Sequence, residues 1–228
     1  VTRGSDLAGA RVLKIDLVRD EVKLEDQAAQ GTVREAAGAA AEHTVGILDI
    51  PDIYGDMEGL RRGDPDARRL TRDVRAILDE FLAGDVEGAV IDLRNNGGGL
   101  LTEAVETTGL FIGSGPVVQV GSGERVGVLS DTDPELYFDR PLVVLVSRLT
   151  SSGAEILAAA LQDYGRAVIV GDERTHGKGC VQSVRPLRER RPELGELKVT
   201  TAMFYRIDGT STQLRGVEPD IRLPTPLE

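Results

Sequence analysis

The sequence GAVIDLRNNGGG, residues 88–99, joins a short apolar run to a loop with three consecutive glycines. The apolar run has the length and composition of a strand that is buried on both faces. A helix over about residues 100–112 is expected after the loop. The same order of strand, small-residue turn, helix and strand recurs over residues 141–146, 151–164 and 167–170. Strands that alternate with helices predict an α/β layered fold with a largely parallel sheet.

Two further elements are expected before this unit. Residues 45–50 form an apolar run that ends at Pro51, which is typical of a buried strand. A helix is then predicted to have Asp64 as its N-cap and Pro65 as its first residue, and to end at Gly84. The apolar face of this helix has a spacing of three and four residues: Leu70, Val74, Ile77, Leu78, Phe81 and Leu82.

The two ends of the chain have a different character. Residues 11–15 and 16–24 predict two short strands, and residues 27–42, rich in alanine and glycine, predict a linker. The last third, residues 180–221, is rich in strand-forming residues, and residues 197–207 are the longest β candidate. No charged and then apolar segment opens the chain, so we expect a mature or excised piece without a signal peptide.

Composition argues against several classes of partner. A net charge of −11 argues against nucleic acid, because binding to phosphates needs a basic surface. The apolar runs are far shorter than the roughly 20 residues of a membrane-spanning helix. One cysteine and two histidines make neither an internal disulfide nor a set of zinc ligands. We therefore expect no metal and no other cofactor.

The loop Asn95–Gly99 is the first candidate site, because it lies between a predicted strand and a predicted helix. Three glycines let the backbone approach a ligand closely and turn its N–H groups towards an oxyanion or a phosphate. The alternative is an ordinary tight turn. The loop lacks the Gly-Lys-Ser/Thr ending of a P-loop and the spacing of a dinucleotide-binding loop.

The second candidate is the turn Thr150–Glu155, which opens a helix. Ser152 at this position is a candidate nucleophile, because the helix dipole favours an anion at the attacked carbonyl. Gly153 leaves room for a substrate next to its N–H group. The alternative is a capping box, in which Glu155 stands three residues after the capping serine.

A nucleophilic serine needs a base. His43 and His176 have no clear aspartate to orient them, and the sequence has no Gly-x-Ser-x-Gly turn. Lysine serves as a base where its pKa is lowered. Lys178 is the candidate, since glycines flank it, and Gln182 follows at strand spacing. A solvated loop lysine is the alternative; the other three lysines, Lys14, Lys23 and Lys198, lie in charged, strand-like segments.

These motifs together resemble those of a known family, the C-terminal processing or tail-specific peptidases. IDLRNNGGGL (91–100) resembles the family's glycine motif, SSGAEILAAALQDYGR (151–166) its nucleophile helix, and VGDERTHGKGCVQ (170–182) its lysine loop. GVEPDI (216–221) is similar to the closing motif, and LVRDEVKLED (17–26) looks like the exit from a PDZ domain. The lysine loop is one residue longer than in many members of the family.

The resemblance implies a layered core like that of crotonases and the Clp protease subunit. It divides the chain into PDZ exit strands (1–26), a linker (27–42) and a catalytic domain (43–228). The resemblance implies that Ser152 is the nucleophile, Lys178 the general base and Gln182 the residue that orients this base. The N–H groups of Gly98 and Gly153 are the implied oxyanion hole, with Gly99 as the alternative register to Gly98. Asp163 is implied to have a structural rather than a catalytic role near the site.

The resemblance implies a serine endopeptidase that acts outside the cytoplasm on unfolded or tail-exposed polypeptides. A PDZ domain is expected in the full-length protein. Two other hypotheses stay open. The first is a non-catalytic peptide-binding scaffold of the same fold. The second is a crotonase-type enzyme acting on acyl-CoA, which shares a glycine oxyanion hole but leaves Lys178 and Gln182 without a role.

Overall fold

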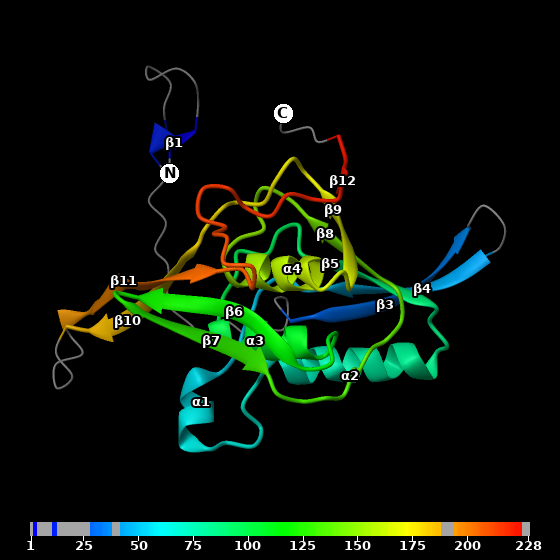
Figure 1. Cartoon of the computed structure of the whole chain (residues 1–228), viewed down its shortest axis with the longest axis horizontal. Coiled ribbons are helices and arrows are strands. Elements are labelled where there is room, and N and C mark those ends of the chain that lie inside the picture. Colours follow the sequence, from blue (N-terminus) through cyan, green and yellow to red (C-terminus); the bar gives the residue numbers. More distant parts are fainter. Residues whose placement is uncertain (1, 4–10, 13–27, 38–41, 188–193, 225–228) are drawn as a thin grey trace.

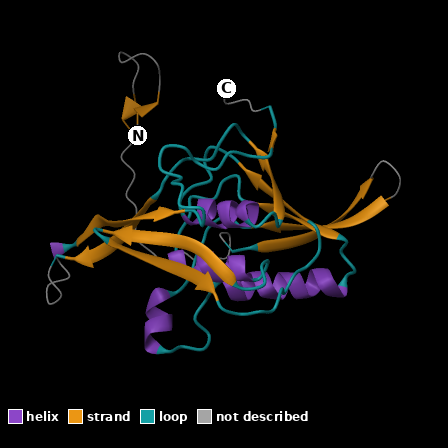
Figure 2. Cartoon of the chain, in the orientation of Figure 1, coloured by secondary structure: helices purple, strands orange, loops and turns teal. Residues whose placement is uncertain are grey.

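The computed structural model describes residues 2–3, 11–12, 28–37, 42–187 and 194–224. Figures 1 and 2 show the arrangement of the helices and strands. The elements in chain order are β1 (Thr2–Arg3), β2 (Arg11–Val12), β3 (Gln30–Ala37), β4 (Glu42–Asp49), α1 (Met57–Arg62), α2 (Leu70–Ala83), β5 (Gly88–Asp92), α3 (Leu101–Gly109), β6 (Gly115–Ser122), β7 (Arg125–Asp131), β8 (Leu142–Val146), α4 (Gly153–Asp163), β9 (Ala167–Gly171), β10 (Cys180–Pro186), β11 (Glu196–Tyr205) and β12 (Ile221–Arg222).

The larger sheet has the strand order β12-β9-β8-β5-β4-β3. Every neighbouring pair is parallel except β3 with β4, which are antiparallel. The prediction of an α/β fold with a largely parallel sheet is therefore confirmed. Because β5 and β8 run in the same direction, the loops after them, residues 93–100 and 147–152, leave the same edge of the sheet.

The prediction of a linker at residues 27–42 is wrong over half of its length, because Gln30–Ala37 is the edge strand β3. Each of its residues pairs with one of β4, from Gln30 opposite Asp49 to Ala37 opposite Glu42. The strand lies against α2: a Cβ added to Gly31 would be only 2.4 Å from Ile77 Cγ2. The small residues that suggested a linker thus allow close packing. The predicted strands 11–15 and 16–24 lie almost wholly outside the described residues.

The predicted start of the long helix is also wrong. The helix α2 begins at Leu70, after the extended residue Arg69, and ends at Gly84 as predicted. The Asp64 carboxylate instead accepts the N–H of Asp66 at 2.9 Å and closes a separate turn. The short helix α1 precedes this turn, and Asp56 caps it by accepting two backbone N–H groups. An acidic residue before a proline therefore marked a loop here.

A second sheet, with strand order β10-β11-β6-β7, is antiparallel throughout. The strand β11 (Glu196–Tyr205) corresponds to the predicted β candidate at 197–207. The hairpin β6–β7 was not predicted. This sheet contacts the helical layer, with β6 against α4 and β7 against α3.

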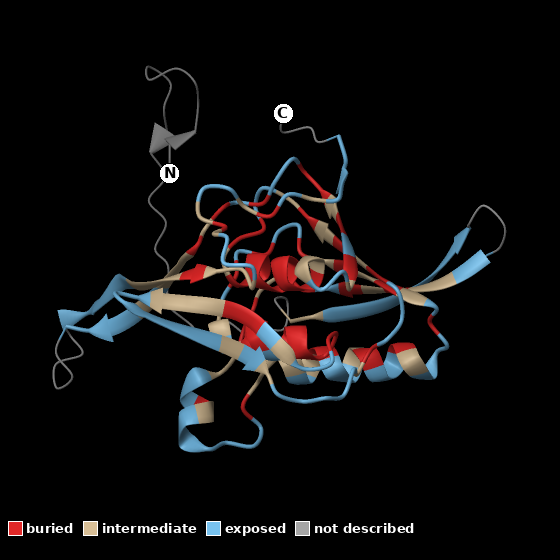
Figure 3. Ribbon diagram, viewed as in Figure 1, coloured by how far each residue is buried: buried red, intermediate tan, exposed pale blue. Residues whose placement is uncertain are grey.

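The helix α4 is the centre of the structure. All nine residues from Gly153 to Leu161 are buried, and the helix contacts β9, β6 and α3. Figure 3 shows it as an almost continuous buried segment. A helix that is buried on all sides suits a position between layers. Its buried N-terminus is thereby fixed next to the loops at the edge of the parallel sheet. No helix in the described ranges is both long and apolar enough to cross a membrane.

We predict that Leu157→Ala lowers the free energy of unfolding by about 2–5 kcal/mol, because it leaves a cavity in the fully buried centre of α4. Denaturant unfolding measures this loss. The matched control is Leu149→Ala, whose side chain is 54% exposed. We expect the control to change the free energy of unfolding by less than about 0.5 kcal/mol. Equal losses in the two variants would contradict the central position of α4.

Candidate active site

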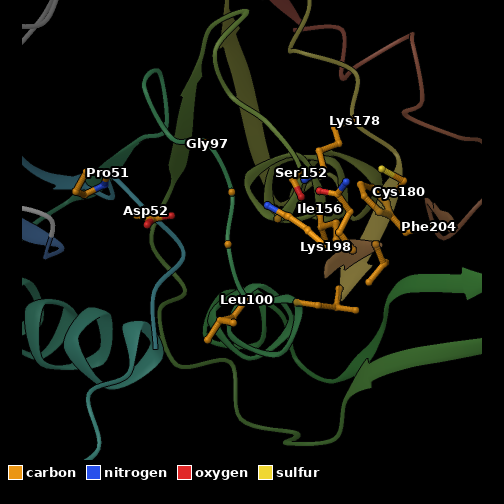
Figure 4. Close-up of a pocket in the computed structure, with 16 residues that line it drawn as sticks. Pro51, Asp52, Gly97, Leu100, Ser152, Ile156, Lys178, Cys180, Lys198 and Phe204 are labelled. Carbon is orange, nitrogen blue, oxygen red and sulfur yellow. The ribbon is translucent and has the colours of Figure 1, made fainter. Parts of the chain in front are cut away.

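A cavity of about 570 Å³ lies where the N-terminus of α4, the glycine loop and the second sheet meet (Figure 4). The five residues predicted for catalysis and the oxyanion hole all line it: Gly98, Ser152, Gly153, Lys178 and Gln182. They come from three separate segments, so the fold brings them together. Neither His43 nor His176 lines the cavity. Among the described residues, no cluster of His, Cys, Asp or Glu side chains could hold a metal.

The glycine loop packs so closely that it requires glycine at two positions. Gly98 has φ +95° and Gly99 has φ +149°. A Cβ on Gly98 would lie 2.6 Å from Ser152 Cβ, and one on Gly99 would lie 2.0 Å from the Ile53 carbonyl oxygen. Backbone hydrogen bonds join Ile53 to Gly98 and to Leu100 and keep the loop at this distance. Close approach to the nucleophile turn explains the run of glycines.

Asn96, which the sequence analysis did not single out, holds the glycine loop in place. It is fully buried, and its Nδ2 donates to the Ile50 carbonyl at 2.7 Å. The backbone carbonyl oxygen of Asn96 accepts the Ser151 N–H at 2.9 Å. Its Oδ1 accepts the Gly98 N–H at 2.8 Å. In this structure the N–H group predicted for the oxyanion hole at Gly98 is thus already hydrogen-bonded.

Two other N–H groups at the cavity are available. The N–H groups of Gly99 and Gly153 donate to no acceptor within the described residues. They are near each other, since the nitrogen of Gly99 lies 3.5 Å from a Cβ built on Gly153. Free N–H groups at a helix N-terminus can stabilise a negatively charged oxygen.

Ser152 has an unusual backbone conformation. Its φ is +57° and its ψ is −117°, a region that residues with a side chain rarely adopt. An N-cap residue ordinarily has an extended backbone, so capping alone does not account for these angles. Strained residues of this kind concentrate at active sites. The capping interaction is nevertheless present, since the Ser152 N–H donates to Glu155 Oε2 at 2.8 Å.

The Glu155 carboxylate joins the nucleophile turn to the lysine loop. It is fully buried and, besides the Ser152 N–H, accepts three hydrogen bonds from the lysine loop. The donors are Thr175 Oγ1 at 2.5 Å, Gly177 N–H at 2.7 Å and Lys178 N–H at 2.9 Å. Sequence reasoning assigned Glu155 a role within its own helix. Only the fold shows that it also sets the position of Lys178.

The glycines beside Lys178 are explained by the segment that contains Gln213 and Leu214. Gln213 Oε1 accepts the Gly179 N–H at 2.8 Å, and the Leu214 N–H donates to the Gly177 carbonyl at 2.8 Å. A Cβ on Gly179 would lie 2.7 Å from the Gln213 nitrogen. Gln213 was not predicted as a site residue, because it lies far from Lys178 in the sequence. The backbone of the lysine is therefore held on both sides.

The side chains of Ser152 and Lys178 face the same cavity at the N-terminus of α4 (Figure 4). Within the described part of the chain, no hydrogen bond joins Ser152 Oγ to Lys178 Nζ, and Lys178 has no ion pair. Gln182 follows on β10, next to a register shift in its pairing with β11. Such irregularities change the direction in which a side chain points. The side chain at this irregularity is Gln182, which lines the cavity.

Asp163 lies away from the cavity, at the C-terminal end of α4. Its carboxylate accepts the Arg206 Nε–H at 3.1 Å and forms a short ion pair with the same guanidinium. Arg206 directly follows β11, so this pair fastens the end of α4 to the second sheet. Any support of the site by Asp163 is therefore indirect, through the position of α4 relative to the second sheet.

The glycine loop offers a matched test of close packing. We predict that Gly98→Ala lowers the free energy of unfolding by about 2 kcal/mol or more, because of its positive φ and the clash with Ser152. Gly97→Ala is the control, since nothing lies within 4 Å of a Cβ there. We expect it to be nearly neutral in denaturant unfolding. A neutral Gly98→Ala would contradict the geometry of the loop.

The chain is similar in sequence to known peptidases. The model of the family described as Peptidase family S41 matches residues 44–223. The chain is 40% identical over 222 residues to the tail-specific protease of Haemophilus influenzae, covering 95% of this chain and 29% of that protein. It is 36% identical over 156 residues to the carboxy-terminal-processing protease of Bartonella bacilliformis, covering 68% of this chain and 35% of that protein.

Solved structures show the same fold. The photosystem II D1 C-terminal processing protease matches with a TM-score of 0.72 and 28% identity, over 95% of this chain and 52% of that one. Mature CPAF, solved in complex with lactacystin, matches in fold, with a TM-score of 0.67 and 18% identity over 86% of this chain and 50% of that one. The chain spans about a third of the length of the curated relatives described here.

Proposed function

The chain belongs to peptidase family S41, and on that premise we propose that it is the catalytic domain of a serine endopeptidase. Its proposed substrates are unfolded polypeptides or polypeptides with an accessible C-terminal tail. The observation that carries the proposal is the meeting of Ser152, Lys178 and two free backbone N–H groups in one cavity. The strained backbone of Ser152 supports it independently.

In the proposed mechanism, the Lys178 amine accepts the proton of the Ser152 hydroxyl while the Ser152 oxygen attacks the peptide carbonyl. The resulting ammonium gives that proton to the leaving amine, which leaves an acyl-enzyme. A water then attacks the ester, with Lys178 again as the base, and releases the new carboxylate. The Gln182 amide is proposed to orient the Lys178 amine at the wall of the cavity.

The oxyanion hole is proposed to include the Gly153 N–H, which opens α4 and has no described acceptor. The Gly98 N–H can serve as the second donor only after its hydrogen bond to Asn96 Oδ1 breaks. The Gly99 N–H needs no such change, because it has no described acceptor and lies next to Gly153. Gly99 is therefore the alternative to Gly98 in this role.

A second candidate function is a non-catalytic peptide-binding scaffold. The observation in its favour is that no hydrogen bond joins Ser152 Oγ and Lys178 Nζ among the described residues. Catalytic hydrogen bonds often form only when substrate is bound, so this observation does not exclude an enzyme. A serine-directed phosphonate distinguishes the two functions, because it labels Ser152 only if that hydroxyl is activated.

The setting of the domain is part of the proposal. Because the chain resembles the bacterial members of the family, we propose that the protein is located outside the cytoplasm. The full-length protein is proposed to carry a PDZ domain that selects substrates, with residues 1–26 as its exit strands and 43–228 as the catalytic domain. Of the intervening residues, Gln30–Ala37 belong to the main sheet and thus extend that domain towards the N-terminus.

We predict that Ser152→Ala and Lys178→Ala each abolish cleavage of an unfolded polypeptide by the full-length protein. Lys178→Arg should also be inactive, because arginine keeps the charge but does not act as a base. Gel assays of substrate loss measure the effect. Ser151→Ala is the control, since Ser151 is buried and does not line the cavity. Cleavage by Ser152→Ala at the wild-type rate would refute the mechanism.

Glu155 is proposed to position Lys178. We predict that Glu155→Gln lowers the cleavage rate by at least about tenfold, because a Gln amide replaces one of the oxygens that accept backbone N–H groups. Glu103→Gln is the matched control: Glu103 is also fully buried, but it binds Arg69 and Thr71 outside the cavity. Both variants should lose stability, by about 1–3 kcal/mol. If Glu155→Gln and Glu103→Gln lost equal activity per folded molecule, the role of Glu155 would be structural only.

A further inference from the structure

A second lysine, Lys198, lines the same cavity as Lys178. It lies on β11, opposite Val184 of β10 and two residues before the partner of Gln182. In Figure 4 its side chain extends from β11 towards Ser152 and the glycine loop. The sequence pattern placed Lys198 among surface charges of a strand. In the structure Lys198 is indeed exposed, and its side chain also lines the open side of the cavity.

No described carboxylate neutralises the Lys198 ammonium. It has neither an ion pair within 4.0 Å nor a hydrogen bond to any residue that the structure describes. Asp52 is the one carboxylate among the residues that line the cavity, and Figure 4 shows it on the other side of the glycine loop. Its Oδ1 accepts the Ile53 N–H at 2.9 Å, and burial raises the pKa of this carboxyl above its ordinary value.

The positive charge of Lys198 at the cavity contrasts with the net charge of the whole chain, which is −11. An acidic protein repels acidic polypeptides at a distance, but a cation in a cavity attracts them locally. The only anionic groups of an unmodified polypeptide are carboxylates, either of acidic side chains or of the C-terminus. An ammonium with three donors and no partner among the described residues matches that group.

We propose that Lys198 binds a carboxylate of the substrate and thereby favours cleavage of polypeptides that carry one close to the scissile bond. This inference rests on the proposed function, since it assigns a specificity-determining residue to the same cavity. Phe204, which lies on the same strand and also lines the cavity, is buried and offers an apolar surface nearer the start of β10. Lys198 lies nearer the start of β11, opposite the later part of β10, and its side chain extends towards Ser152 in Figure 4. The bound carboxylate is therefore expected close to the scissile bond.

The experiment uses the full-length protein and matched pairs of peptides. The two peptides of a pair are identical except at one position, where one carries Glu and the other Gln. This position differs from one pair to the next, so that the pairs together scan the peptide. Each peptide is made with a free and with an amidated C-terminus, which distinguishes a side-chain carboxylate from a terminal one. The quantity measured is the ratio of kcat/KM for the charged peptide over that for the neutral one.

In wild type we expect a ratio of about five at one position or at the free C-terminus, as an ion pair in a partly exposed site gives. Lys198→Gln should bring the ratio to about one, and Lys198→Glu should invert it. The control is Arg185→Gln. Arg185 is exposed on β10, pairs with Leu197 of β11 and does not line the cavity, so this variant should keep the wild-type ratio.

The inference is overturned if the ratio is the same in wild type and Lys198→Gln at every position and at both kinds of C-terminus. It is also overturned if Arg185→Gln changes the ratio as much as Lys198→Gln does, because the effect would then come from the general charge of the sheet. Failure of the proposed function gives a different result, since no peptide would then be cleaved faster by wild type than by Ser152→Ala.

Discussion

The buried carboxylate of Glu155 is the interaction on which the site depends. It accepts hydrogen bonds from the nucleophile turn and from three groups of the lysine loop. A buried carboxylate is costly unless its oxygens are satisfied by donors, so these two segments can be joined here only in a few arrangements. The cost of burying Glu155 therefore becomes a constraint on where the backbone of Lys178 lies relative to Ser152.

The same constraint fixes the end of the lysine loop. Thr175, Gly177 and Lys178 bind Glu155, and the His176 N–H donates to the Thr150 carbonyl at 2.9 Å. The end of the loop is therefore anchored residue by residue to the start of α4. Arg174, immediately before Thr175, is exposed and donates to the Leu214 carbonyl. These contacts together set the position of the Lys178 backbone.

Glycine is the other requirement of the site, and it acts through close contact between backbones. Gly98 lies against the nucleophile turn, Gly99 against Ile53, and Gly177 and Gly179 against the segment of Gln213 and Leu214. In each case a Cβ atom would lie 3.1 Å or less from the neighbouring segment, which is tighter than ordinary van der Waals contact, so the segments would have to move apart. The cavity is thus bounded by backbone that is fixed in position, which suits a site whose proposed oxyanion donors are backbone N–H groups.

The parallel α/β order, the central helices and the candidates Ser152, Lys178 and Gln182 could be predicted from local sequence patterns. Strand and helix periodicity and glycine motifs are properties of neighbouring residues, so they are visible in the sequence. The remaining features depend on contacts between distant segments. The strand Gln30–Ala37 is defined by its pairing with β4, which its small residues do not reveal. Asn96, Gln213 and Lys198 reach the site through contacts between segments that are distant in the chain. Ser152 and Lys178 share a cavity because Glu155 holds their loops together, and that convergence depends on packing, which sequence patterns do not contain.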